Sequence, residues 1–322
     1  MRDRNIWLDG IMGLVTGDAL GSPVQFMSRS EIRKQGLVEG MEAGGTYGHP
    51  AGTWSDDSSM TLATVDSFLM KGGIDPDDIM MRFMKWYYNG EYTPFGRSFD
   101  RGATCSQAIK AYAESHDWET CGRTDEYANG NGALMRILPA CLYCINLKDD
   151  RAEKIVGDLT GITHNHMRAR MASVLYFYLA RSIVKRNGSL QDRLLQGSDD
   201  FFDYKGASHE ETVECRHLYR TAEIIEYGER DFKEEDIKST GYVIDSLEAA
   251  VWSLMTTDSF ESCLLRAVNL GDDADTVGAI AGGLAGLYYG YEAIPSKWLH
   301  VIQRRQWIED LCEAANARYT AR

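Results

Sequence analysis

The sequence has no excess of basic residues: Lys and Arg together number 34, against 48 Asp and Glu, which gives a formal net charge of −14. Non-specific electrostatic binding to nucleic acid or to anionic lipid needs a surplus of positive charge. We therefore expect no nucleic-acid partner and no membrane partner. A local basic pocket is still compatible with this charge balance.

Long hydrophobic runs are also missing. The most apolar stretch, residues 276–291, ends at Glu292 and is shorter than the ~20 residues that cross a bilayer. The stretch from Met1 to Gly10 lacks the charged-then-apolar pattern of a secretory signal. We therefore expect a cytoplasmic protein without a membrane span.

The cysteines do not form a zinc-binding pattern. They number 7, an odd count, and Cys141 and Cys144 make the one CxxC pair. A zinc ribbon needs a second pair at suitable spacing. In a reducing compartment, cysteines act mainly as small buried hydrophobes. We therefore expect Cys141 and Cys144 to be core residues on one helix.

Alternation of apolar and polar residues at sheet spacing is absent, whereas helical periodicity recurs along the whole chain. This pattern predicts an all-α fold. The expected helices cover residues 6–20, 60–70, 79–88, 103–115, 133–145, 152–161, 167–184, 212–227, 243–255, 260–268, 276–289 and 298–317. The polar stretch 196–211 is expected to be an exposed loop. Because no Pro-rich or Ser-rich linker interrupts the chain, we expect a single domain over residues 1–322.

The expected helix at 276–289 is unusual because glycine recurs every four residues within it, at Gly278, Gly282 and Gly286. A glycine inside a helix costs about 1 kcal/mol relative to alanine. We therefore expect other helices to approach this one closely, at the centre of the bundle.

Two clusters of acidic and hydroxyl residues stand directly before expected helices, at residues 53–60 and 270–276. Helix capping alone would explain one or two acids at such a junction. Acids that face one another have raised pKa values unless a cation lies between them, and Mg²⁺ takes carboxylate and hydroxyl oxygens. On spacing alone, capping and metal binding explain the clusters equally well.

Several short motifs follow one another in a characteristic order. They are Gly-Asp-Ala-Leu-Gly at 17–21, Gly-Thr-Trp-Ser-Asp-Asp-Ser-Ser-Met at 52–60, Phe-Asp-Arg-Gly at 99–102, Asn-Gly-Asn-Gly-Ala-Leu-Met-Arg at 129–136, Thr-His at 163–164, Ser-Leu-Glu-Ala-Ala-Val-Trp at 246–252 and Asn-Leu-Gly-Asp-Asp-Ala-Asp-Thr at 269–276. This order resembles the ADP-ribosylglycohydrolase family, most closely the bacterial members that remove ADP-ribose from an arginine of dinitrogenase reductase. The resemblance implies a compact all-α orthogonal bundle with a central cleft that binds two Mg²⁺ or Mn²⁺ ions.

The resemblance also implies which residues carry the chemistry. The metal ligands would be Ser55, Asp56, Asp57, Asp273, Asp275 and Thr276. Asp272 stands where many members have glycine, and we expect it not to bind metal. Asp100 matches an aspartate that points at the scissile bond, although an N-cap of the helix from Ala103 is the alternative. Asp57 is the second residue to which we assign a catalytic role.

The family pattern further implies a set of substrate-binding residues. They are Gly130, Asn131, Gly132, Met135, Arg136, His164 and Tyr242. The glycine-rich turn at 130–132 can bring backbone amides close to a phosphate, and a plain turn is the alternative. Arg136 would contact the diphosphate or pair with Asp57 or Asp273. His164 would lie near the substrate or be structural, and Tyr242 would contact the adenosine end.

One residue departs from the family pattern. Gln25 stands where close relatives have a glutamate, and glutamine cannot exchange a proton. If that glutamate normally transfers a proton or binds metal, then either Asp100 carries the proton transfer here or activity is reduced.

The resemblance implies a metal-dependent hydrolase that removes ADP-ribose from arginine side chains of proteins. Its partner would be an ADP-ribosylated protein, and we expect a monomer. Two alternatives stay open: hydrolysis of O-linked ADP-ribose on serine or in an ester, and a non-catalytic family member. The complete set of expected metal ligands argues against the second alternative.

Overall fold

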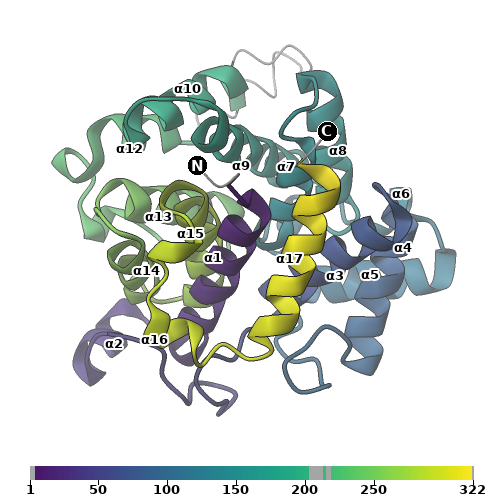
Figure 1. The fold of residues 1–322 in the computed structure, drawn as a ribbon, viewed down its shortest axis with the longest axis horizontal. Helices are drawn as coiled ribbons and strands as arrows, with labels where there is room; N and C mark the ends of the chain where they lie inside the picture. The colour runs from purple at the N-terminus through teal and green to yellow at the C-terminus, as the bar shows by residue number, and fades with distance from the viewer. Residues whose placement is uncertain (1–3, 203–212, 215–218, 321–322) are drawn as a thin grey trace.

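The computed structural model describes residues 4–202, 213–214 and 219–320, and this part of the chain is built from helices without a β-sheet (Figure 1). The all-α prediction is confirmed. The α-helices are α1 (Ile6–Gly21), α2 (Arg29–Gln35), α3 (Asp56–Lys71), α4 (Pro76–Met84), α5 (Ala103–Ser115), α6 (Trp118–Cys121), α7 (Leu138–Cys144), α8 (Asp149–Gly161), α9 (Met167–Lys185), α10 (Leu190–Phe202), α12 (Thr221–Tyr227), α13 (Val243–Met255), α14 (Phe260–Asn269), α15 (Ala274–Tyr289), α16 (Ser296–Leu299) and α17 (Arg305–Tyr319).

Most helices lie where the periodicity places them, and the differences have local causes. Helix α3 begins earlier than expected because the Ser55 side chain caps it, and it ends at Gly72, whose φ of 75° is left-handed. The expected helix 133–145 is divided into a 3₁₀ turn, Leu134–Arg136, and α7, which has Pro139 in its first turn. The expected helix 298–317 is likewise divided into α16 and α17.

The loop prediction for residues 196–211 is wrong over its first part. Helix α10 continues to Phe202, and it buries Leu194 and Phe201. Gln196 and Asp199, between these two, are exposed, so the polar stretch resembles a loop although it is amphipathic. The remainder of the predicted loop lies outside the described residues, and so does part of the helix expected at 212–227.

Helices α1 and α15 pack with their backbones in contact, side by side in Figure 1. A Cβ atom on Gly17 would lie 1.9 Å from the carbonyl oxygen of Gly278, and one on Gly13 would lie 2.2 Å from that of Gly282. Helix α15 also contacts α9, α13 and α14. The predicted close approach is confirmed, and it brings the C-terminal half of α1 against the start of α15.

Two expectations about the rest of the chain can be checked directly. Cys141 and Cys144 are both buried on α7, as expected for core residues. No helix in the described part of the chain is long and apolar enough to cross a membrane.

Candidate metal centre and adjoining cavity

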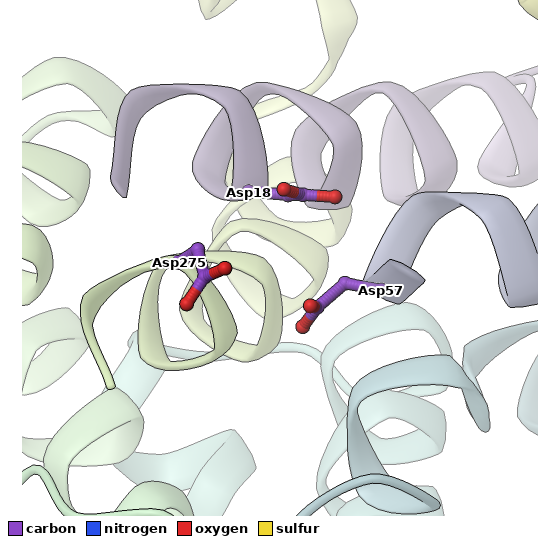
Figure 2. A group of neighbouring side chains, drawn as sticks. All are labelled: Asp18, Asp57 and Asp275. Atoms are coloured by element: carbon purple, nitrogen blue, oxygen red, sulfur yellow. The ribbon is translucent and has the colours of Figure 1, made fainter. Parts of the chain in front are cut away.

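Three carboxylates from three helices converge in the interior: Asp18 of α1, Asp57 of α3 and Asp275 of α15 (Figure 2). One carboxylate oxygen of each residue lies within 4.8 Å of the others, and all three side chains are buried. The packing of α1 against α15 supplies two of these residues, and the start of α3 supplies the third.

The donor set of this three-aspartate cluster fits a hard divalent cation. Asp57 Oδ1 and Asp275 Oδ2 are buried and accept no hydrogen bond, and an unpartnered buried polar atom costs about 1–3 kcal/mol. Burial and the neighbouring carboxylates raise the pKa of Asp57 and of Asp275 well above the usual value. Mg²⁺ and Mn²⁺ take carboxylate oxygens. A cation bound here would satisfy both oxygens and offset the repulsion.

Asp18 holds the start of α3 in place. Its carboxylate accepts hydrogen bonds from the backbone N–H of Ser55 at 2.9 Å, and from the backbone N–H and the hydroxyl of Ser58 at 3.0 and 2.5 Å. Burial raises the pKa of Asp18 to about 6, although the bonds from Ser58 and Ser55 act in the opposite direction. These bonds fix where the neighbouring Asp57 points.

Asp18 was missed as a site residue by the sequence analysis. The sequence feature that could have identified Asp18 is a carboxylate within a helix whose other residues are nearly all apolar or small. A carboxylate buried in such a helix needs a partner.

A cavity of about 230 Å³ opens beside the three-aspartate cluster. Its walls are formed by Gln25, Phe26, Asp56, Asp100, Gly102, Ala103, Thr104, Cys105, Gly130, Asn131, Gly132, Met135, His164, Asp273 and Thr276. The cavity therefore joins the acidic centre to the residues that were expected to bind substrate.

The six expected metal ligands gather at this centre. Asp56, Asp273 and Thr276 line the cavity, while Asp57 and Asp275 lie in the cluster below it. The Ser55 hydroxyl donates to Asp57 Oδ2 at 2.9 Å, so Ser55 is hydrogen-bonded to another expected ligand. Ligation by each residue stays a prediction.

A second hydrogen bond orients an acid in the cavity wall. Asp273 Oδ2 accepts from Asn131 Nδ2 at 2.6 Å. The same Asn131 nitrogen donates to the Ser246 hydroxyl at 2.8 Å. Asn131 therefore ties the glycine-rich turn to the start of α15.

Asp100 lies in the cavity wall and its backbone has a left-handed φ of 50°. Gln25 Nε2 donates to its Oδ2 at 2.5 Å, and Tyr47 Oη donates to its Oδ1 at 3.1 Å. The capping alternative is wrong, because Gly102 is the N-cap of α5 and no side chain caps that helix. Burial raises the pKa of Asp100, and the bonds from Gln25 and Tyr47 act in the opposite direction.

Five of the expected substrate-binding residues line the cavity: Gly130, Asn131, Gly132, Met135 and His164. One amide of the glycine-rich turn is already used, because the Asn131 N–H donates to the carbonyl oxygen of Gly241 at 3.0 Å. The remaining surface of the turn faces the cavity. His164 is neutral, because burial and the charges of Arg136 and Arg123 lower its pKa to about 3.

Arg136 and Tyr242 do not line the cavity, and their contact with substrate stays a prediction. The Arg136 guanidinium is buried and donates to the Leu159 carbonyl and, at 2.7 Å, to the Thr163 hydroxyl. Within the described residues it forms no ion pair with an aspartate. Arg136 therefore supports the wall behind His164, whose Nδ1 lies 2.9 Å from the same hydroxyl. Tyr242 is the N-cap residue of α13, with its backbone bridged to Gly130.

Comparisons with known proteins cover almost the whole chain. A family model described as ADP-ribosylglycohydrolase matches residues 2–322. ADP-ribosylarginine hydrolase Tri1 of Serratia proteamaculans (strain 568) is 32% identical over 305 residues, which cover 94% of this chain and 76% of that protein. The ADP-ribosyl dinitrogen reductase glycohydrolase of Rhodospirillum rubrum is 34% identical over 295 residues, which cover 91% of this chain and 88% of that protein.

A solved structure shares the fold. The structure of an ADP-ribosylglycohydrolase-related protein complex superposes with a TM-score of 0.80 at 30% sequence identity, and it covers 99% of this chain and 100% of that chain. The helical bundle is therefore common to these two proteins.

Proposed function

The chain belongs to the ADP-ribosylglycohydrolase family, and on that premise we propose that it hydrolyses the N-glycosidic bond between ADP-ribose and an arginine side chain of a protein. The observation that carries this proposal is the three-aspartate cluster beneath a cavity that Asp100 also lines. Relatives named as hydrolases of ADP-ribosylarginine and of ADP-ribosyl dinitrogen reductase, at 32 and 34% identity, support arginine as the linkage.

We further propose that the centre holds two Mg²⁺ or Mn²⁺ ions. Asp18, Asp57 and Asp275 would hold one ion, and Asp56, Asp273 and Thr276 line the cavity where a second would bind. A bound divalent ion polarises substrate oxygens and lowers the pKa of a bound water. Asp57, which was expected to be catalytic, lies in the cluster and would act by holding metal.

The protein's own groups position this chemistry. The bonds from Ser55 and Ser58 to Asp18 fix the start of α3, and Asn131 fixes the orientation of Asp273. The neutral His164 and the turn at 130–132 face the space that the rest of ADP-ribose would fill.

Asp100 is the group that we propose for proton transfer. Hydrolysis adds the hydroxide of a water to C1 of the ribose and leaves a proton for the departing guanidine nitrogen. Asp100 lines the cavity, and burial raises its pKa toward the range of a general acid or base. Gln25 cannot replace it, because an amide has no proton to exchange.

The linkage is tested by incubating the protein and Mg²⁺ with two substrates, one carrying ADP-ribose on arginine and one carrying it on serine, and measuring released ADP-ribose. We expect release from the arginine-linked substrate. Release from the serine-linked substrate alone would replace the proposed linkage. The monomeric state, the single-domain organisation and the cytoplasmic location of the protein stay predictions.

A further inference from the structure

An aromatic cluster lies next to Asp100 of the cavity wall, on two loops that come together there. It consists of Tyr47, His49, Phe95 and Phe99, which we call the aromatic rim. The ring centroids of His49 and Phe99 lie 4.4 Å apart, those of Tyr47 and Phe99 5.3 Å apart, and those of His49 and Phe95 5.5 Å apart. Tyr47 is 36% exposed and Phe95 is 45% exposed, so the aromatic rim offers ring surface to solvent instead of closing into the core.

The loop that carries Tyr47 has a defined shape. Gly44 and His49 exchange backbone hydrogen bonds of 2.8 and 3.1 Å, which closes the loop as a small hairpin. Gly45, with a φ of 70°, lies so close to Pro23 that a Cβ atom there would be 2.7 Å from Pro23 backbone atoms. The hairpin is therefore seated on the segment that follows α1, and its Tyr47 reaches Asp100, which lines the cavity.

The aromatic rim is joined to the cavity through Asp100. The Tyr47 hydroxyl donates to Asp100 Oδ1, and Phe99 is its neighbour in the chain. The hydrogen-bond donors Gln25 and Tyr47 are uncharged, and the Asp275 carboxyl group is a further side-chain partner of Asp100. Among the described residues no Lys or Arg offsets the charge of this carboxylate. A carboxyl group without a cationic partner among the described residues thus lies beside the aromatic rim.

His49 takes part in the aromatic rim as a neutral ring. Burial, and secondarily the charge of Arg97, lower its pKa below the usual value. It therefore adds no positive charge that would repel a cation near Asp100.

We propose that the aromatic rim and Asp100 together bind the arginine side chain that carries ADP-ribose, and that the aromatic rim makes the enzyme select guanidinium-linked substrates. This proposal rests on the proposed function. A guanidinium is planar and charged, stacks on aromatic faces and pairs with carboxylates. A serine linkage offers neither a flat face nor a charge, so the aromatic rim would give it no stabilisation.

The test separates the arginine end of the substrate from the ADP-ribose end. It measures KM for an ADP-ribosyl-arginine protein and the Kd of free ADP-ribose, which has no arginine, for wild type and for Tyr47→Leu, Phe99→Leu and Tyr47→Phe. We expect Tyr47→Leu and Phe99→Leu to raise KM about three- to thirtyfold, the range for a lost cation–π contact. The Kd of ADP-ribose should stay within twofold.

Tyr47→Phe separates the ring from the hydroxyl. It keeps the aromatic face and removes the hydrogen bond to Asp100, so KM should stay near wild type while kcat falls. Tyr227→Ala, a tyrosine on α12 whose ring contacts Arg230, is the control and should change neither constant. Phe95→Ser, at an exposed position, replaces Phe99→Leu if the latter fails to fold.

Two failures can be told apart. If wild type releases no ADP-ribose from the arginine-linked protein, the proposed function is wrong. If wild type releases it but both leucine variants keep the wild-type KM, the function stands and the proposal for the aromatic rim is overturned. An equal rise in KM and in the Kd of ADP-ribose would also overturn it, because the aromatic rim would then support the ADP-ribose cavity as a whole.

Discussion

Gln25 donates its side-chain amide to the carboxylate of Asp100 over 2.5 Å. A carboxylate without a proton can only accept hydrogen bonds, so the Gln25 nitrogen must face Asp100. This contact explains how a chain with glutamine at this position keeps Asp100 oriented in the cavity wall. It also shows what a glutamate would meet there.

The first prediction follows from that contact. Gln25→Glu would place a second carboxylate against Asp100, so the two would repel or share one proton. We expect the turnover rate to rise by less than tenfold or to fall. Asp100→Asn should be far more damaging, by about 10²–10⁴-fold, the range for a lost proton-transfer group. A hundredfold gain for Gln25→Glu, with Asp100→Asn near wild type, would show that the roles are reversed.

Substitutions of Asp18 and of Asp57 should change the free energy of unfolding by different amounts, although we expect both residues to be needed for activity. Asp18→Ala leaves the N–H groups of Ser55 and Ser58 without their acceptor and should lower the free energy of unfolding by about 2–4 kcal/mol, because buried donors lose their partners. Asp57→Ala removes one unpartnered buried oxygen and one that accepts from the Ser55 hydroxyl, but it also relieves repulsion among buried carboxylates, so the metal-free protein should stay closer to wild-type stability. Urea unfolding of both variants in EDTA measures the difference. Equal losses would contradict the assignment of Asp18 as the residue that anchors α3.

The stability of the metal-free protein should depend on pH in the direction set by Asp18. Its pKa in the folded protein is raised to about 6, so the folded state binds this proton more tightly than the unfolded state does. The stabilising contribution is present at pH 4 and is lost as pH rises through 6. Asp57 and Asp275, whose pKa values are raised as well, act in the same direction.

Thermal unfolding in EDTA between pH 4.5 and 7.5 measures this dependence. Asp18→Asn shows the general pH trend. We expect the unfolding temperature of wild type to fall across this range relative to that trend. Mg²⁺ should reduce the fall, because the cation replaces the protons. If metal-free wild type and metal-free Asp18→Asn both become more stable at high pH, and by the same amount, the proposed role of Asp18 is wrong.

The contact between α1 and α15 predicts a severe effect of small substitutions. A methyl group on Gly17 would lie 1.9 Å from the carbonyl oxygen of Gly278, which is a backbone atom. Gly17→Ala should therefore cost several kcal/mol of stability or prevent folding, in the range of the larger overpacking effects. Gly40→Ala is the matched control, because its nearest atom, Trp298 Nε1, lies at 3.5 Å. Circular dichroism melts compare the two.

Periodicity and glycine spacing predicted the helical fold and its central contact because both depend on local residue patterns. The acids at the starts of α3 and α15 could be found for the same reason, since helix starts carry a recognisable signal. Asp18 escaped notice because its role depends on α3 packing against α1, a contact between distant segments. The alternative that Arg136 pairs with Asp57 or Asp273 is wrong, because Leu159 and Thr163 lie near enough to take its hydrogen bonds, which the sequence does not show.

We propose that release of ADP-ribose from arginine requires divalent metal at the three-aspartate cluster. The most direct measurement uses protein stripped with EDTA, with metal removal confirmed by elemental analysis, and follows ADP-ribose release from an ADP-ribosyl-arginine protein before and after Mg²⁺ or Mn²⁺ is restored. We expect no release before metal is restored, recovery after it, and no recovery in Asp57→Ala. Full release by the metal-free wild-type protein would contradict this proposal.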